Sequence, residues 1–281
     1  MSIFVVGSLH LDVVLRAPHL PALDETVVGK AVDYVFGGKG GNQAVAAARF
    51  GAKVHFGGRA GSDSFGDMLR KTLLEYGVDI HQLQQDAGPS GMSAAIINHA
   101  GDYGAVIVSA ANLNIDANAL TVPAGTQIVL LQNEIPEAVN IDVARKAKAS
   151  GAQVWLNAAP ARPLASALTE HLDLLIVNRV EAAFCAQSSP IIRVLETQGG
   201  DGVAYNGQHW PACSAKVIST HGAGDMFVGA LAATVASGVA IEDAIDTAQA
   251  AAAWFISTPL VEREKATPEA IRVAVAAQLN P

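Results

Sequence analysis

Short runs of β-branched and other apolar residues alternate along this chain with longer segments of helical periodicity. Such alternation is typical of a mostly parallel β-sheet whose strands are joined by helices that cover both of its faces. Strands are expected at residues 3–6, 54–58, 127–131, 153–156, 174–177 and 193–196, and helices at 41–50, 63–76 and 137–150. From residue 222 onward the sequence is helical and rich in alanine. The sequence therefore predicts a three-layer α/β fold.

Two stretches interrupt this alternation, at residues 12–36 and at about 91–109. The second has alternating apolar positions on either side of a polar turn at 99–104, which is the pattern of a β-hairpin. We expect these strands to form a small β-sheet outside the main one. In an α/β enzyme the natural role of such an insertion is a lid, and a decorative hairpin or a contact between subunits is the alternative.

The charge balance excludes a nucleic-acid-binding face. The chain has 281 residues, 51% of them hydrophobic, and its 18 Lys and Arg against 26 Asp and Glu give a net charge of −8. This composition supports one large domain or two smaller ones, whereas an acidic surface repels phosphate backbones. The longest uncharged run, at 226–241, is shorter than the roughly 18 residues that a membrane span needs. The first residues do not have the pattern of a secretory signal, so a cytoplasmic protein is expected.

Several kinds of catalytic site lack the residues that they need. Cys185 and Cys213 are too far apart in the sequence for a C-x-x-C redox motif. The eight histidines show no paired metal-ligand spacing, and there is no G-x-S-x-G turn. A transition-metal site and a hydrolase triad are therefore unsupported.

The most informative motif is the turn at residues 219–225, Ser-Thr-His-Gly-Ala-Gly-Asp, which runs directly into an uncharged helical segment. Such a turn presents free backbone N–H groups and the positive end of the helix dipole, so it predicts a phosphate-binding site. A carboxylate beside that site is unfavourable unless it takes a proton from the group that attacks the phosphate. Asp225 is therefore a candidate general base. A helix cap over a tightly packed turn is an equally good local explanation.

A second glycine-rich turn, Gly-Gly-Lys-Gly-Gly-Asn-Gln at residues 37–43, also leads into an alanine-rich helix. It is not a P-loop, because Lys39 is followed by glycine, and it lacks the dinucleotide-binding spacing. Closely spaced glycines suit a backbone that approaches a ligand, and Asn42 offers both a donor and an acceptor to a polyol. A purely structural helix start is the alternative.

Polar residues also follow two of the expected strands. Asp12 comes shortly after the first strand, at the edge where a parallel sheet places its ligand crevice, and can accept hydrogen bonds from two sugar hydroxyls. A solvated loop aspartate is the alternative. Asn178 and Glu181 follow the strand at 174–177 and face the same side of a new helix. Their oxygens suit Mg²⁺ held through water beside a nucleotide phosphate, or equally a helix cap with a capping-box glutamate.

In combination these segments resemble the ribokinase-like, PfkB-type carbohydrate kinases. The likeness is carried by the turns at 37–43 and 221–225, by Gly7, Ser8 and Asp12, by residues 134–136 and 157–163, by Asn178-x-x-Glu181 and by the turn at 197–202. The motifs occur in the family's order over nearly the whole chain. The resemblance implies one three-layer α/β domain over residues 1–281, with segments 12–36 and 91–109 inserted as a β-sheet lid. Because such lids often pair subunits, a homodimer is expected.

Members of this family transfer the γ-phosphoryl group of Mg-ATP to a primary hydroxyl of a sugar or nucleoside. The resemblance assigns the general base to Asp225 and the anion hole to the N–H groups of Gly222, Ala223 and Gly224. Sugar binding is assigned to His10, Asp12, Gly38, Lys39, Asn42 and Glu134. Nucleotide binding is assigned to Asn178, Thr197, Gly199, Gly202 and Gln249, with Asn178 and Glu181 organising Mg²⁺. We expect an ATP-dependent pentose kinase, with a nucleoside or ketose kinase, or a non-catalytic binding homologue, as alternatives.

Three departures from the family pattern affect the expected cation and sugar sites. Ser219 replaces an aspartate that contributes to a monovalent-cation site, and residues 257–262 replace the loop that completes this site. We therefore expect only weak stimulation by K⁺. His10 replaces an asparagine ahead of Asp12, which changes both the size and the hydrogen-bonding pattern of that position. This change leaves the identity of the sugar open.

Overall fold

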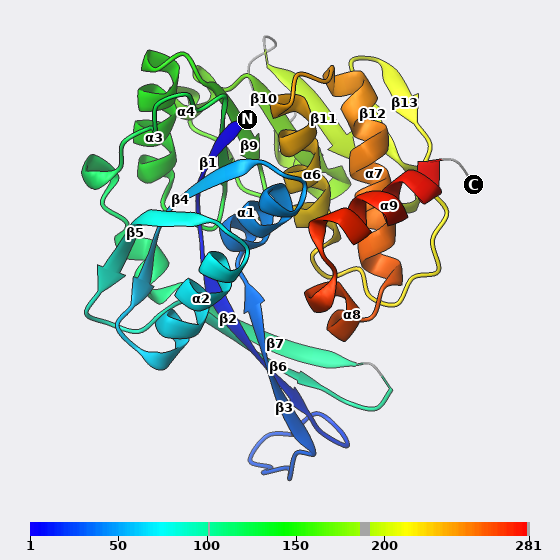
Figure 1. Ribbon diagram of the computed structural model, residues 1–281. Helices are drawn as coiled ribbons and strands as arrows, with labels where there is room; N and C mark the ends of the chain where they lie inside the picture. Colours follow the sequence, from blue (N-terminus) through cyan, green and yellow to red (C-terminus); the bar gives the residue numbers. More distant parts are fainter. Residues whose placement is uncertain (101, 186–191, 280–281) are drawn as a thin grey trace.

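A nine-stranded sheet forms the centre of the molecule, which a computed structural model describes over residues 1–100, 102–185 and 192–279. Its strands are β1 (Ser2–Val6), β4 (Lys53–Gly61), β5 (Asp79–Asp86), β8 (Ile128–Gln132), β9 (Gln153–Asn157), β10 (Leu174–Asn178), β11 (Arg193–Thr197), β12 (Val203–Tyr205) and β13 (Gln208–Trp210). They lie in the order β13-β12-β11-β10-β9-β8-β1-β4-β5 (Figure 1). The pairs from β11 to β5 are parallel, and the β11–β12 and β12–β13 pairs are antiparallel. The predicted, mostly parallel sheet is confirmed.

The six strands expected from the sequence form the middle of this sheet, and the three that were not expected lie at its edges. The edge strand β5 reads Asp-Ile-His-Gln-Leu-Gln-Gln-Asp, and most of its positions are only partly buried. An edge strand can carry polar residues because part of it faces solvent. The strands β12 and β13 have three residues each, too few to show a period. Apolar periodicity therefore identified the six central strands and missed the edges.

Helices cover both faces of the sheet, as predicted. One hydrophobic core contains Ile3 and Val5 of β1, and the other contains Phe4 and Val6 of the same strand. The alternation of side chains along a strand divides the two cores. The first core is completed by α1 (Lys39–Arg49), α2 (Ser64–Glu75), α6 (Ala223–Ala236), α7 (Ile241–Ser257) and α9 (Pro268–Leu279), and the second by α3 (Glu137–Ala149) and α4 (Ser166–Thr169).

Five further short helical elements occur among the residues that the structure describes. They are α5 (Arg179–Cys185), α8 (Leu260–Lys265), and the 3₁₀ helices η1 (Ala110–Asn114) and η2 (Ala117–Ala119), with a further 3₁₀ turn η3 at Gly199–Asp201. The longest helix, α7, has 17 residues. Within the part of the chain that the structure describes, no helix combines the length and the apolar character that crossing a bilayer requires.

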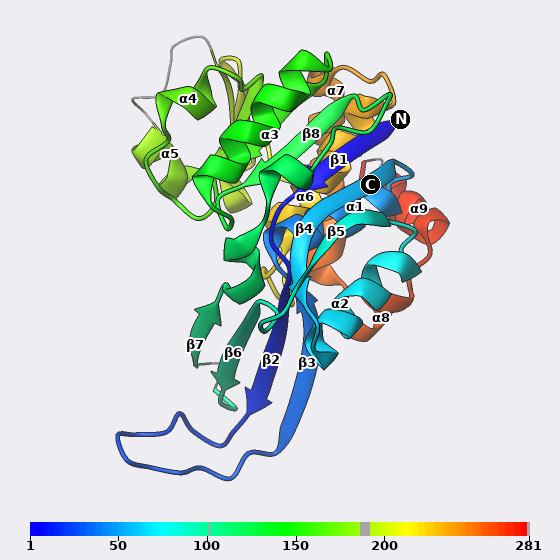
Figure 2. The ribbon, with the colours of Figure 1, turned by 90° about the vertical axis from the view of Figure 1, so that its left-hand side faces the viewer.

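The two stretches that broke the alternation form a separate four-stranded sheet. Its strands are β2 (His10–Arg16), β3 (Ala31–Gly37), β6 (Met92–Ile97) and β7 (Tyr103–Val108), in the order β3-β2-β6-β7. Both hairpins are antiparallel, and the parallel pairing of β2 with β6 joins them. Figure 2 shows this small sheet projecting from one end of the main sheet. Since β2 follows β1 directly and β3 leads into α1, the small sheet adjoins the carboxyl end of β1.

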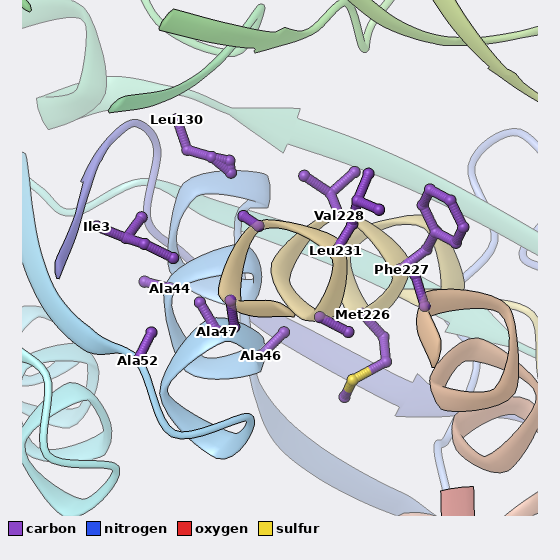
Figure 3. Packing of buried hydrophobic residues seen from close by; sticks show 14 of the residues in the cluster. Ile3, Ala44, Ala46, Ala47, Ala52, Leu130, Met226, Phe227, Val228 and Leu231 are labelled. Carbon is purple, nitrogen blue, oxygen red and sulfur yellow. The ribbon is translucent and has the colours of Figure 1, made fainter. Parts of the chain in front are cut away.

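The helices α1 and α6 pack closely against each other (Figure 3), and hydrogen bonds from Asn42 and Gln43 to Asp225 link their N-terminal turns. A Cβ atom added to Gly229 of α6 would lie 2.4 Å from Cβ of Ala46 and 2.7 Å from the carbonyl oxygen of Gln43, both in α1. Side chains of ordinary size would therefore hold the helices apart. The small residues at this contact set the distance between the two glycine-rich turns that precede α1 and α6.

Candidate active site

The candidate site lies where the carboxyl end of β1, the base of the small sheet and the N-termini of α1 and α6 meet. Gly38 immediately precedes α1 and has a φ of 86°, in the left-handed region that favours glycine. A Cβ at this position would lie 2.8 Å from the backbone nitrogen of His10 and 2.8 Å from the carbonyl oxygen of Ser8. Glycine is thus required by both the conformation and the close approach of two backbones.

Asp225 is buried at the third position of α6, with 8% of its surface exposed. Its Oδ2 accepts a hydrogen bond of 3.2 Å from Asn42 Nδ2, and its Oδ1 accepts one of 3.0 Å from Gln43 Nε2. Burial raises the pKa of Asp225, and the charge of Lys39 together with the bonds from Gln43 and Asn42 opposes this rise. The surroundings thus hold a desolvated carboxylate by hydrogen bonds to its charged form.

The turn ahead of Asp225 leaves the start of α6 without a side-chain cap, and the backbone nitrogen of Ala223 donates to the carbonyl oxygen of Thr220 at 3.2 Å. Gly222 is the N-cap residue, with a φ of 80°, and it carries no side chain that could cap the helix. The adjoining Gly224 is exposed, whereas Asp225 is buried. The N–H groups of an uncapped first turn attract anions. The structure therefore places a helix N-terminus without a side-chain cap and a buried carboxylate side by side.

Glu134 connects the end of β8 to the glycine-rich turn before α1. Its Oε2 accepts hydrogen bonds from the backbone nitrogen of Lys39, at 2.8 Å, and from the hydroxyl of Ser8. The His10 ring nitrogen Nδ1 lies 3.9 Å from the same oxygen. Glu134 is also close enough to Asp225 for its negative charge to raise the pKa of Asp225. Glu134, His10, Lys39 and Asp225 therefore belong to one site.

A cavity of about 390 Å³ adjoins this group. His10, Glu134, Asn133 and Arg162 line it together with apolar residues that include Ile107. His10 is 4% exposed, and its Nε2 atom has no hydrogen-bond partner among the residues that the structure describes. The cavity thus extends the space available beside Glu134.

Asp12 lies on β2, inside the small sheet. Its Oδ1 accepts a hydrogen bond of 2.5 Å from the Ser93 hydroxyl, which ties β2 to β6. A Cβ at Gly37 would lie 2.3 Å from Asp12 Oδ2, so the carboxylate abuts the start of the turn at 37–43. The structure therefore places Asp12 beside the glycine-rich turn but gives it no direct bond to Glu134 or Asn42 among the described contacts.

Asn178 and Glu181 form a reciprocal cap at the start of α5. The Asn178 Oδ1 atom accepts hydrogen bonds of 2.9 Å from the backbone nitrogens of Val180 and Glu181. In return, Glu181 accepts from the Asn178 backbone nitrogen at 2.8 Å and from its side chain at 2.9 Å. This arrangement is the helix cap that was one of the two interpretations of the motif.

The same pair is compatible with a hydrated metal ion. Each carboxylate oxygen of Glu181 accepts one hydrogen bond in the cap and retains a second lone pair, so it can also bind a water molecule of a hydrated Mg²⁺. A metal ion bound directly by side chains would need several ligands close together. Within the described ranges, no three His, Cys, Asp or Glu residues are grouped suitably for such a site.

The other expected nucleotide residues lie beside this cap. Thr197 ends β11 directly opposite Asn178, and Gly199 and Gly202 form the following turn. Gly202 has a φ of 107°, and a Cβ there would lie 2.0 Å from the carbonyl oxygen of Trp210. Gln249 is buried on α7 and is not part of this turn. The structure therefore groups Asn178, Glu181, Thr197, Gly199 and Gly202, whereas Gln249 lies on a different element, α7.

The two segments that depart from the family's cation site are adjacent. The backbone nitrogens of Ile218 and Ser219 both donate to the carbonyl oxygen of Ile256, at 2.8 and 3.3 Å. Residue 256 immediately precedes the altered segment 257–262. The phenyl ring of Phe255 also comes within 3.1 Å of a Cβ position at Gly222. Ser219 and the segment that begins at residue 257, which replace the family's cation ligands, therefore lie next to each other beside the turn before Asp225.

Three polar residues that hold Asp225, either directly or through one another, were not expected from the sequence. Gln43 donates to Asp225 and, at 3.1 Å, to Asn157 Oδ1, while its own Oε1 accepts from Gln132 Nε2 at 2.8 Å. A signal for them was present in the sequence. Gln132 and Asn157 are amides at the carboxyl ends of two otherwise apolar strands, β8 and β9.

The comparison with known proteins agrees with this geometry. Residues 1–266 match the family described as pfkB family carbohydrate kinase. The chain is 34% identical over 271 residues to the ribokinase of Bacillus subtilis, and this match covers 91% of this chain and 92% of that relative. It is 32% identical over 264 residues to the ribokinase of Lactococcus lactis, covering 87% of each.

Solved structures show the same architecture. Arabidopsis thaliana ribokinase complexed with ribose and ATP superposes with a TM-score of 0.87 at 25% identity, covering 97% of this chain and 98% of that one. The ribokinase of Thermotoga maritima gives a TM-score of 0.85 at 26% identity, with coverage of 98% and 99%. Since the match extends through both glycine-rich turns and both sheets, this chain belongs to the pfkB family of carbohydrate kinases.

Proposed function

We propose that this protein is an ATP-dependent sugar kinase that phosphorylates the primary hydroxyl of a ribose-like pentose. The observation that carries the proposal is the buried carboxylate of Asp225, held by amides from α1 beside the uncapped start of α6. A non-catalytic binding protein gains nothing from a desolvated carboxylate next to an anion site. The relatives at 32–34% identity are named as ribokinases, which supports a pentose as the acceptor.

The proposed reaction needs a base, an anion hole and correct positioning. Asp225 accepts the proton of the primary hydroxyl as the hydroxyl oxygen forms its bond to the γ-phosphorus. The bond from that phosphorus to the β,γ-bridging oxygen breaks, and ADP leaves with the electron pair. The N–H groups of Gly222, Ala223 and Gly224 stabilise the charge on the transferring group. Lys39, whose charge already acts on Asp225, adds a positive charge to the same region.

The sugar is proposed to lie between the small sheet and α1. Glu134, which accepts from the Lys39 backbone, and Asn42, which donates to Asp225, are proposed to line this space together with Gly38, and Asp12 and His10 of β2 are proposed to complete it. The cavity of about 390 Å³ beside His10 and Glu134 favours one second candidate. A nucleoside or a ketose, which is larger than ribose at one end, could place the additional group there.

On the nucleotide side, Asn178, Thr197, Gly199 and Gly202 are proposed to bind ATP, with Gln249 near the adenine. The cap of Asn178 and Glu181 would hold Mg²⁺ through water, and the ion would supply charge neutralisation for the phosphates. With Ser219 and the segment 257–262 in place of the usual cation ligands, we expect weak K⁺ dependence. Since the reaction consumes Mg-ATP, we place it in the cytoplasm.

We also propose that the small sheet is a lid that excludes water from the phosphoryl transfer and joins two subunits. Its edge strand β7 exposes Tyr103, Val106 and Ile107, which are 71%, 66% and 62% exposed. An exposed apolar edge strand favours pairing with a second copy. Sedimentation tests this. The wild type should be a dimer and Val106→Lys a monomer, and a monomeric wild type would contradict the proposal.

The function is tested by ADP release from Mg-ATP across a panel of ribose, deoxyribose, ketoses, hexoses and nucleosides, with a magnesium-free control. Magnesium-dependent turnover with a pentose is the expected result. In the same assay Asp225→Asn should lower kcat by roughly 100-fold or more while both substrates still bind. Asp243→Asn, which alters an exposed carboxylate in the first turn of α7, is the matched control. Normal turnover by Asp225→Asn would exclude its role as the base.

A further inference from the structure

The side chain of Gln43 links the base Asp225 to the ends of two strands of the main sheet. Gln43 is fully buried, with 0% of its surface exposed. Its Nε2 atom donates to Asp225 Oδ1 and to Asn157 Oδ1, and its Oε1 atom accepts from Gln132 Nε2. Gln132 is itself fully buried, and its backbone carbonyl oxygen accepts a hydrogen bond of 2.8 Å from Asn140 Nδ2. The amide of Gln43 is therefore held from three directions.

The carboxylate determines which way this amide points. An ionised carboxylate only accepts hydrogen bonds, so the side of Gln43 that faces Asp225 must be the NH₂ group. The opposite orientation would place two oxygens against each other in a buried site. With Oε1 turned to Gln132, both N–H bonds of the amide are used, one on Asp225 and one on Asn157. Gln43 thus has no polar group left to offer to a substrate.

The two carboxylate oxygens of Asp225 accept hydrogen bonds from different residues. Oδ1 is bonded to Gln43, which is inaccessible, and Oδ2 is bonded to Asn42, which is only partly buried and lies on the proposed sugar side. A sugar hydroxyl can compete for Oδ2 but cannot reach the bond at Oδ1. The carboxylate therefore presents one defined oxygen to the acceptor, provided that Gln43 keeps the other in place.

We propose, on the basis of the kinase function above, that Gln43 is a positioning residue that anchors Oδ1 of Asp225 so that Oδ2 receives the proton of the acceptor hydroxyl. In the transfer step that proton moves from the hydroxyl oxygen to Oδ2, the hydroxyl oxygen bonds to the γ-phosphorus, and ADP departs with the electrons of the broken bond. Gln43 neither gains nor loses a proton. Its hydrogen bond to Oδ1 also favours the ionised form of Asp225 and so opposes the rise in the pKa of this carboxyl group that burial causes.

The test compares Gln43→Met with Gln132→Met. Methionine has a similar length and no amide, so Gln43→Met removes the bond to Asp225. Gln132→Met removes the hydrogen bond between the side-chain amides of Gln132 and Gln43, but it leaves the Nε2 atom of Gln43 free to donate to Asp225. We expect Gln43→Met to lower kcat by about 10- to 100-fold with a change in the sugar KM of less than about threefold. We expect its acidic limb in the kcat against pH profile to move up by roughly one pH unit, because the base loses a bond to its charged form.

A purely structural role for the amide predicts a different result. In that case both methionine variants lose thermal stability to a similar extent, and neither moves the acidic limb. A Gln43→Met enzyme with the wild-type limb and kcat would overturn the proposal. A second variant, Gln43→Glu, places a carboxyl group against Asp225, and should move the acidic limb to higher pH even further.

The outcome also separates this inference from the proposed function. If the wild type does not phosphorylate any acceptor in the panel, the function itself fails. If the wild type turns over and Gln43→Glu retains its kcat and pH profile, only the positioning role fails. Failure of both Gln43 variants to fold, with Gln132→Met folded, would also count against the proposal, since the amide would then serve the fold.

Discussion

Replacing Gly229 with alanine tests whether the close packing of α1 and α6 holds the site together. The added methyl group would lie 2.4 Å from Cβ of Ala46, 2.7 Å from the carbonyl oxygen of Gln43 and 2.8 Å from the backbone nitrogen of Ala47. Carbon atoms in contact normally lie at least about 3.5 Å apart, so the helices must separate by roughly 1 Å. Two of these three neighbours are backbone atoms, which no rotamer change can move aside.

Two opposing effects set the size of the change. In the middle of a helix, alanine is more favourable than glycine by roughly 0.5–1 kcal/mol, whereas overpacking a well-filled contact typically costs about 1–3 kcal/mol. We therefore expect Gly229→Ala to lower the free energy of unfolding by about 1–2 kcal/mol. Because Gln43 bonds to Asp225 at 3.0 Å across the same contact, kcat should fall as well.

Urea unfolding followed by circular dichroism measures the stability, with Gly104→Ala as the matched control. A methyl group at Gly104 would meet nothing within 4 Å, and that glycine has no positive φ. Adding Ala46→Gly to Gly229→Ala removes the shortest contact and leaves the two backbone contacts, so it should restore part of the stability. A Gly229→Ala protein as stable as the wild type, or more so, would refute this account of the α1–α6 contact.

Two further substitutions probe single interactions elsewhere. Asn112 is fully buried, and its side chain accepts from the backbone nitrogen of Leu9 and donates to the backbone oxygen of Leu9, both at 2.8 Å. Asn112→Ala should therefore lower the free energy of unfolding in urea by about 2–3 kcal/mol. A change within error of zero would contradict this prediction. The backbone nitrogen and ring of His81, with a hydrogen bond from His55, lower the pKa of Asp79 from 3.8 to about 2. The ionised group therefore contributes stability above its unfolded pKa, and this contribution is lost as the pH falls through about 2. Asp79→Asn should make the thermal unfolding temperature less dependent on pH between about 4 and 2, and an unchanged slope would contradict this.

Much of the fold and of the site followed from local sequence. Apolar periodicity located the six central strands and the helices between them because a buried strand or an amphipathic helix shows its burial in its own residues. The two glycine-rich turns were recognisable because the conformation at Gly38 and Gly222 is one that glycine adopts readily. Asp225, Lys39, Asn42 and Glu134 were expected in one site, and the structure places them there.

Other features were decided only by the tertiary structure. The Asn178 and Glu181 pair was compatible with a cap or a metal site, and only the hydrogen bonds showed that it forms the cap. The parallel pairing of β2 with β6 joins segments about 80 residues apart in the chain. Gln43 and Asp225 are 182 positions apart, and they meet because Gly229 lets α1 approach α6. Local sequence determines turns, caps and periodicity, since these depend on neighbouring residues, but contacts between distant segments depend on how whole elements pack.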